Sequence, residues 1–184
     1  MSFTRRHLPH WIPEDAAVFV TWRLAGSLPP QAETDDKKRS SVPPSILRQD
    51  EQLDQARYGP IWLQDSRVAS VVVNALLYGE DIRRFYELHA WVVMPNHVHA
   101  ILQPRGAMST IMRWLKGRTG RAANRILGRT KTPFWQDESF DHWVRSAEEF
   151  QDLIEYVENN PVKAGLVGAK ERWRWSSAAV DRRS

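Results

Sequence analysis

The stretch from Trp91 to Leu102, WVVMPNHVHAIL, constrains the fold more than any other part of this sequence. Two runs of β-forming residues, 86–93 and 97–103, are joined by only three residues, which predicts an antiparallel β-hairpin. Successive side chains of a strand point to opposite faces, so His97 and His99 should project from the same face. The hairpin therefore presents two imidazoles side by side on a rigid element.

This histidine pair has two interpretations. Neutral imidazoles placed in this way can hold a divalent metal ion. Alternatively, the two rings merely form hydrogen bonds beneath a loop. The chain contains no cysteine, which excludes disulfides and thiolate metal sites and favours a cytoplasmic location.

The rest of the sequence predicts a strand at 17–24 and a short strand at 141–145, where His142 and Val144 share a face. Three helices are expected: one from the N-cap Asp65 to Gly79, one at 109–127 beginning at Ser109, and one at 147–159 that Pro161 ends. The order strand, helix, strand, strand, helix, strand, helix is the ferredoxin-like pattern with an additional C-terminal helix. We therefore expect an α+β fold, an antiparallel sheet with helices packed on one face.

The length of 184 residues favours a single domain spanning 1–184. Residues 25–60 contain five prolines and a solvated charge run at 35–39, and their apolar content is too thin for a separate core. We interpret this region as an insertion with a short helix at 46–58. No apolar run is long enough to span a membrane and no secretory signal is evident, so we expect no membrane partner.

The charge distribution points to a polyanionic partner. The formal net charge is +4 and the pI is about 9.6, and residues 105–131 contain eight basic side chains and no acidic one. A solvated helix face usually mixes both signs, so contact with nucleic acid or phosphate is favoured here. The candidate DNA-binding residues are Arg113, Lys116, Arg118, Arg121, Arg125 and Arg129. Residues 132–160, with eight acidic residues and one basic, should add little attraction for DNA.

Tyr156 lies on the flank of the last predicted helix, and Asn160, four residues later, shares its face. Amphipathic packing is one interpretation of this tyrosine. The other is a nucleophile, although a phenol with a pKa near 10 is only about one part in a thousand ionised at pH 7. A divalent metal on His97 and His99 would make a phosphate more electrophilic, and the Asn160 carboxamide oxygen is able to fill a further coordination position.

Two segments resemble the signatures of single-tyrosine, single-strand DNA transposases. These segments are WVVMPNHVHAIL and YVENNPVKAGLV, at 91–102 and 156–167, and the tail segment WRWSSA at 173–178 is similar to a motif of the REP-associated branch. The resemblance covers roughly residues 10–178. It implies that His97 and His99 are metal ligands, that Tyr156 is the nucleophile and that Asn160 helps to complete the metal site. His142 falls where a histidine often occurs in this branch and is an accessory candidate.

The resemblance also implies a reaction and its partners. The tyrosine attacks a single-stranded DNA phosphate held on Mg²⁺ or Mn²⁺, giving a 5′-phosphotyrosine and a free 3′-OH that allow later rejoining without ATP. Hairpin-forming repeats are the expected DNA, and the protein is expected to be a monomer or a homodimer. Two alternatives remain open: a ferredoxin-like nucleic-acid binding module without cleavage activity, and a metal-dependent hydrolase that uses water.

Overall fold

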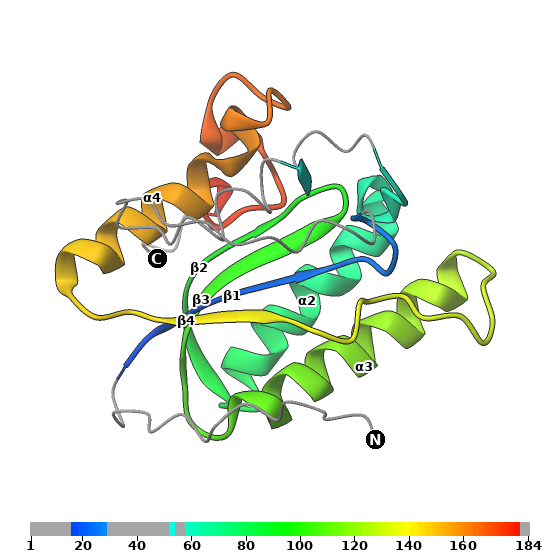
Figure 1. Cartoon of the computed structure of the whole chain (residues 1–184), viewed down its shortest axis with the longest axis horizontal. Coiled ribbons are helices and arrows are strands. Elements are labelled where there is room, and N and C mark those ends of the chain that lie inside the picture. Colours follow the sequence, from blue (N-terminus) through cyan, green and yellow to red (C-terminus); the bar gives the residue numbers. More distant parts are fainter. Residues whose placement is uncertain (1–15, 29–51, 54–57, 181–184) are drawn as a thin grey trace, which may run out of the picture.

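A four-stranded antiparallel sheet forms the centre of the computed structural model, which describes residues 16–28, 52–53 and 58–180 (Figure 1). The strand order is β2-β3-β1-β4, and every neighbouring pair is antiparallel. This arrangement confirms the ferredoxin-like α+β fold expected from the order of elements. The strands are β1 (Val18–Arg23), β2 (Tyr86–Val93), β3 (His97–Pro104) and β4 (Phe140–Trp143).

The two faces of the sheet carry different helices. On one face lie α2 (Ser66–Asp81) and α3 (Met108–Ile126), and on the other lies α4 (Ala147–Lys163), as Figure 1 shows. Alternate strand residues divide the core accordingly, because neighbours in a strand face opposite sides. Trp22 and Leu102 pack toward α2 and α3, whereas Phe19 and Ile101 pack toward α4. His97 and His99 alternate with Val98 on β3, so they share the α4 face.

Several expected boundaries are corrected by the structure. The strand at 86–93 is confirmed as β2, whereas β4 occupies Phe140–Trp143 rather than 141–145. Helix α3 begins after Ala107, and Ser109 lies inside it without acting as the cap. Most of the expected insertion at 25–60, including nearly all of its short helix, lies outside the described residues.

Pro161 does not end the last helix, which continues to Lys163. A proline removes one backbone donor but leaves the carbonyl groups able to accept. The N–H of Ala164 bonds to the Asn160 carbonyl at 3.0 Å, so helical hydrogen bonding continues past the ring. Pro161 is also buried. We attribute the continuation of α4 beyond Pro161 to this burial. Pro161 also lies in the last turn, where its ring disrupts few helical hydrogen bonds.

Gly79 does not end α2 either, because the helix runs on to Asp81. A Cβ at Gly79 would lie 2.2 Å from the Tyr86 hydroxyl oxygen. That hydroxyl is buried and donates a hydrogen bond of 2.8 Å to the Leu76 carbonyl. Glycine is therefore required here for the close approach of helix and strand.

The C-terminal tail lies along β2, the edge strand next to α4. The Val93 N–H donates to the Trp175 carbonyl at 2.8 Å, and the Trp173 indole N–H donates to the Val93 carbonyl at 3.0 Å. The Ser177 hydroxyl accepts from the Trp91 N–H at 3.1 Å and donates to Glu158 of α4 at 3.2 Å. The tail thus fastens the end of α4 to the sheet. No helix in the described part of the chain is long and apolar enough to cross a membrane.

Replacing Gly79 by Ala tests the close contact between α2 and β2. Helix propensity alone would make alanine more stable by about 1 kcal/mol. The contact with Tyr86 should reverse that sign and lower the free energy of unfolding by about 1–3 kcal/mol, as measured by denaturant titration. Gly106→Ala is the control, because a Cβ there meets nothing within 4 Å. A Gly79→Ala protein as stable as the parent would contradict the packing argument.

Candidate active site

The two histidines of β3 converge on each other. The Nε2 atoms of His97 and His99 lie 3.0 Å apart, and both side chains are fully buried. The other nitrogen of each ring is held by a neighbour: His97 Nδ1 lies 2.7 Å from Asn96 Oδ1, and His99 Nδ1 lies 2.7 Å from Thr21 Oγ1. The Asn96 amide is itself oriented, because its Nδ2 donates to the Leu53 carbonyl at 2.9 Å.

These contacts fix the tautomer of His97. Asn96 Oδ1 can only accept, so His97 Nδ1 carries the proton and its Nε2 presents a lone pair toward His99. Two ligands at neighbouring positions of an octahedral ion, each about 2.1 Å from it, lie about 3.0 Å apart. The separation of the two Nε2 atoms therefore fits a shared metal ion, and Thr21 Oγ1 would accept from His99 Nδ1 if His99 bound such an ion through Nε2.

Tyr156 lies on α4, the helix that covers the histidine face of the sheet, and its ring packs beside His99. Its ring centroid lies 6.0 Å from that of His99 and 6.2 Å from that of Phe19, and Phe19 stacks on His99 at 5.4 Å. The side chain is only 7% exposed, so it is more enclosed than a helix-flank position suggests. The structure thus brings Tyr156 against the histidine pair across 57 residues of sequence.

Asn160 lies one helical turn beyond Tyr156 on the same face of α4 and is fully buried. Neither its amide oxygen nor its amide nitrogen has a hydrogen-bond partner among the described residues. A buried polar group in that state is costly, and an ordered water, an ion or a ligand would satisfy it. An amide oxygen is a kind of donor that can complete a coordination sphere begun by two imidazoles. No group of three or more His, Cys, Asp or Glu side chains able to hold a metal occurs in the described ranges.

His142 does not join the histidine pair. Its Nε2 lies 2.8 Å from Glu149 Oε1 in the first turn of α4, and the other Glu149 oxygen accepts from the Arg145 N–H at 2.6 Å. Both partners of this contact are largely shielded from solvent. His142 therefore ties β4 to the beginning of α4, and an accessory role in the chemistry stays a prediction.

The basic helix α3 lies on the face of the sheet opposite Tyr156. Burial lowers the pKa of Lys116, whose ammonium donates to the Asp137 carbonyl at 2.7 Å. Arg129 lies over the Trp62 ring at 3.5 Å, and Arg118 lies over the Tyr78 ring at 5.1 Å. The remaining candidates, Arg113, Arg121 and Arg125, are exposed. A DNA strand held at Tyr156 would have to pass around an edge of the sheet to reach these exposed arginines.

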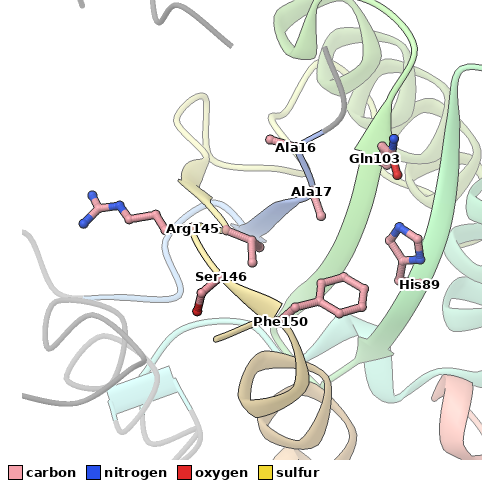
Figure 2. A pocket seen from close by; sticks show the side chains of 8 residues that line it. Ala16, Ala17, His89, Gln103, Arg145, Ser146 and Phe150 are labelled. Atoms are coloured by element: carbon pink, nitrogen blue, oxygen red, sulfur yellow. The ribbon is translucent and has the colours of Figure 1, made fainter. Parts of the chain in front are cut away.

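A hollow of about 350 Å³ lies at the other end of the α4 face, beneath the start of that helix. Figure 2 shows Phe150 and His89 pointing toward each other on one side of it, while the Arg145 side chain extends away. The centroids of these two rings are 5.0 Å apart. The hollow contains none of the candidate site residues.

Sequence reasoning missed the groups that hold the imidazoles in place. Asn96 stands directly before His97, so its position in the hairpin turn was a usable signal. Thr21 is 78 residues from His99, and only the register of β1 against β3 reveals it. Lys163 was also missed: its ammonium lies 4.5 Å from the centroid of the Tyr156 ring.

Comparisons with known proteins find transposases among the proteins similar to this chain. Residues 77–160, which include both histidines, Tyr156 and Asn160, match the family described as IS200-like transposases. The REP-associated tyrosine transposase of Escherichia coli (strain K12) is 30% identical over 97 residues, which are 51% of this chain and 55% of that protein. The chain thus matches about half the length of this relative.

A solved REP-associated tyrosine transposase bound to a REP hairpin has the same fold. The TM-score is 0.54 at 22% identity, and the match covers 96% of this chain and 82% of that one. The segment carrying the histidine pair and the tyrosine is thus the part of the chain that matches the IS200-like transposase family. The resemblance to the REP-associated branch, predicted from the two motifs, is confirmed.

Replacing Asn160 by Leu tests whether the buried amide is kept for a ligand. Removing an unsatisfied buried amide by a side chain of similar shape should raise the free energy of unfolding of the metal-free protein by roughly 1–3 kcal/mol. The same change should reduce stabilisation by added Mn²⁺. Thermal unfolding in chelator and in Mn²⁺ measures both effects, with the half-buried neighbour variant Asn159→Leu as control. Destabilisation of the metal-free Asn160→Leu protein would contradict a ligand role.

Proposed function

We propose that this protein is a metal-dependent enzyme that nicks and rejoins single-stranded DNA at hairpin-forming repeats, with Tyr156 as nucleophile. One observation carries the proposal. A tyrosine on α4 contacts a buried histidine pair whose Nε2 atoms are 3.0 Å apart. Neither the tyrosine nor the histidine pair indicates this reaction on its own. Together they supply a nucleophile beside a position suited to a metal and a phosphate.

In the proposed reaction the Tyr156 hydroxyl oxygen attacks phosphorus. The new bond joins this oxygen to phosphorus, the bond between phosphorus and the 3′ oxygen breaks, and the proton lost by the phenol is balanced by the proton gained at the 3′-OH. Mg²⁺ or Mn²⁺ bound by His97, His99 and Asn160 would supply Lewis-acid polarisation of the phosphate. The products are a 5′-phosphotyrosine and a free 3′-OH. The phosphodiester bond energy is retained, so rejoining is the same step in reverse.

The environment of Tyr156 supports this role. Phe19 and His99 pack against its ring and limit its rotation, which orients the hydroxyl before the phosphate arrives. Only 7% of the side chain is exposed, so little of the Tyr156 ring is open to water.

Hairpin DNA is the proposed substrate, and two observations support it. The solved relative with the same fold is described as bound to a REP hairpin. In this chain the exposed arginines of α3 offer an electrostatic surface for a hairpin stem, with the flexible single strand next to the stem passing around the sheet edge to Tyr156. The oligomeric state in which the enzyme would act stays open between monomer and homodimer.

Replacing Tyr156 by Phe tests the nucleophile. Incubating the protein with Mn²⁺ and single-stranded hairpin DNA from the flanks of its own gene should give a covalent protein–DNA adduct, visible on a denaturing gel. The phenylalanine variant keeps the ring packing but has no hydroxyl, so it should form no adduct while binding the hairpin with unchanged affinity. Tyr78→Phe, at an exposed tyrosine of α2, should retain adduct formation.

Three other outcomes would indicate a different nucleophile or a different function. An adduct formed by Tyr156→Phe would rule out this tyrosine as the nucleophile. Hairpin binding without an adduct in Mg²⁺ or Mn²⁺ would indicate a nucleic-acid binding module. Free 5′-phosphate ends without an adduct would indicate a hydrolase that uses water.

Replacing His99 by Gln tests the metal. Losing one imidazole ligand should remove several kcal/mol of transition-state stabilisation, so the rate of adduct formation should fall by on the order of 10²-fold or more. The concentration of Mn²⁺ needed for half-maximal rate should rise in the same variant. Chelator should abolish the adduct with the parent protein, and an adduct that forms at full rate in chelator would contradict metal dependence.

A further inference from the structure

Lys163 stands in the last turn of α4, on the solvent side of the nucleophile. Its ammonium lies 4.5 Å from the centroid of the Tyr156 ring, and the residue is exposed. Seven residues separate the two positions, which is two helical turns, so the lysine side chain reaches back along the helix to the tyrosine.

The charge of Lys163 is not neutralised by the described part of the chain. Helix α4 carries five acidic residues, Glu148, Glu149, Asp152, Glu155 and Glu158, yet none forms an ion pair with Lys163. The positions three and four residues before it are the neutral Asn160 and Asn159. An acid at either position would be the natural helical partner of a lysine.

The nearest acid along the helix is engaged elsewhere. Glu158 accepts from the Lys170 ammonium at 2.9 Å and from the Ser177 hydroxyl at 3.2 Å. Glu158 raises the pKa of Lys170 through this hydrogen bond. The tail of the chain thus neutralises Glu158, and an available cation remains beside Tyr156 on an otherwise acidic helix.

We propose that Lys163 binds a non-bridging oxygen of the phosphate that Tyr156 attacks. This inference rests on the proposed function and adds a substrate-binding residue to it. A phosphate within reach of the Tyr156 hydroxyl lies beside the ring over which the ammonium sits, and a charge-assisted hydrogen bond is the usual interaction of lysine with phosphate. Lys163 transfers no proton in this role. It offsets repulsion from the acidic helix and holds the phosphate against the nucleophile.

The test compares two substrates that differ in one charge. The first is a hairpin strand with a normal scissile phosphodiester, and the second carries a neutral methylphosphonate at that linkage. Single-turnover adduct formation in saturating Mn²⁺ and DNA is measured for the parent protein, Lys163→Met and Lys163→Arg. With the phosphodiester, Lys163→Met should be slower by about 10–100-fold, which corresponds to about 1.4–2.7 kcal/mol. Lys163→Arg should retain most of the rate.

With the methylphosphonate, the parent and Lys163→Met should react at rates within about threefold of each other, because the charge that Lys163 contacts has been removed. A merely structural role would slow both substrates equally. Arg172→Met, which removes an exposed cation of the C-terminal tail outside the basic segment, should match the parent on the phosphodiester.

The outcomes separate this inference from the proposed function. If the parent forms the adduct and Lys163→Met matches it on the phosphodiester, the lysine assignment is wrong while the enzyme stands. Equal losses on both substrates would also overturn it. A parent protein that forms no adduct with the phosphodiester would overturn both proposals together.

Discussion

The register between β1 and β3 is the constraint on which the rest of the site depends. It places Thr21 opposite His99, so that the hydroxyl holds one imidazole, and it places Phe19 beside the same ring. A slip of one residue would turn every side chain of β3 to the other face. The histidines would then face α2 and α3, and Val98 would face Tyr156. The apolar residues that alternate with the histidines prevent such a slip, because they fill the core beneath α2 and α3.

The two faces of the sheet differ in the side chains that they bury. The face covered by α2 and α3 holds the larger apolar cluster, whereas the face covered by α4 contains buried polar groups among its apolar side chains. Asn160 is the costliest of these, since neither polar atom of its amide has a partner within the described residues. A sequence selected only for stability would not retain this amide. The tail clamps α4 over these groups through its bonds to β2 and Glu158, so the structure holds the tyrosine helix against the histidines.

Much of this arrangement was predictable from sequence. Alternation and turn chemistry gave the hairpin, and the order of elements gave the ferredoxin-like sheet. That topology brings the last helix near the histidine face. The contact between Tyr156 and His99 was therefore predictable from the histidine motif on β3 and the tyrosine motif on α4. The part that could not be predicted depends on contacts between distant residues. Sequence alone predicts a helix end at Gly79, because only the packed structure reveals its contact with Tyr86. Local rules likewise predict a stop at Pro161, because they do not include the burial of its ring. The topology places α3 on the face opposite Tyr156, which the charge pattern of the basic segment alone does not show.

The proposed mechanism requires that His97, His99 and Asn160 surround one metal position beside Tyr156. Anomalous diffraction from crystals of the protein soaked in Mn²⁺ would locate this position. A single strong peak is expected about 2.2 Å from each of the two Nε2 atoms and from Asn160 Oδ1, a distance usual for a first-row divalent ion. A saturating soak that leaves no peak between the two imidazoles, or that places Mn²⁺ only elsewhere, would contradict this mechanism.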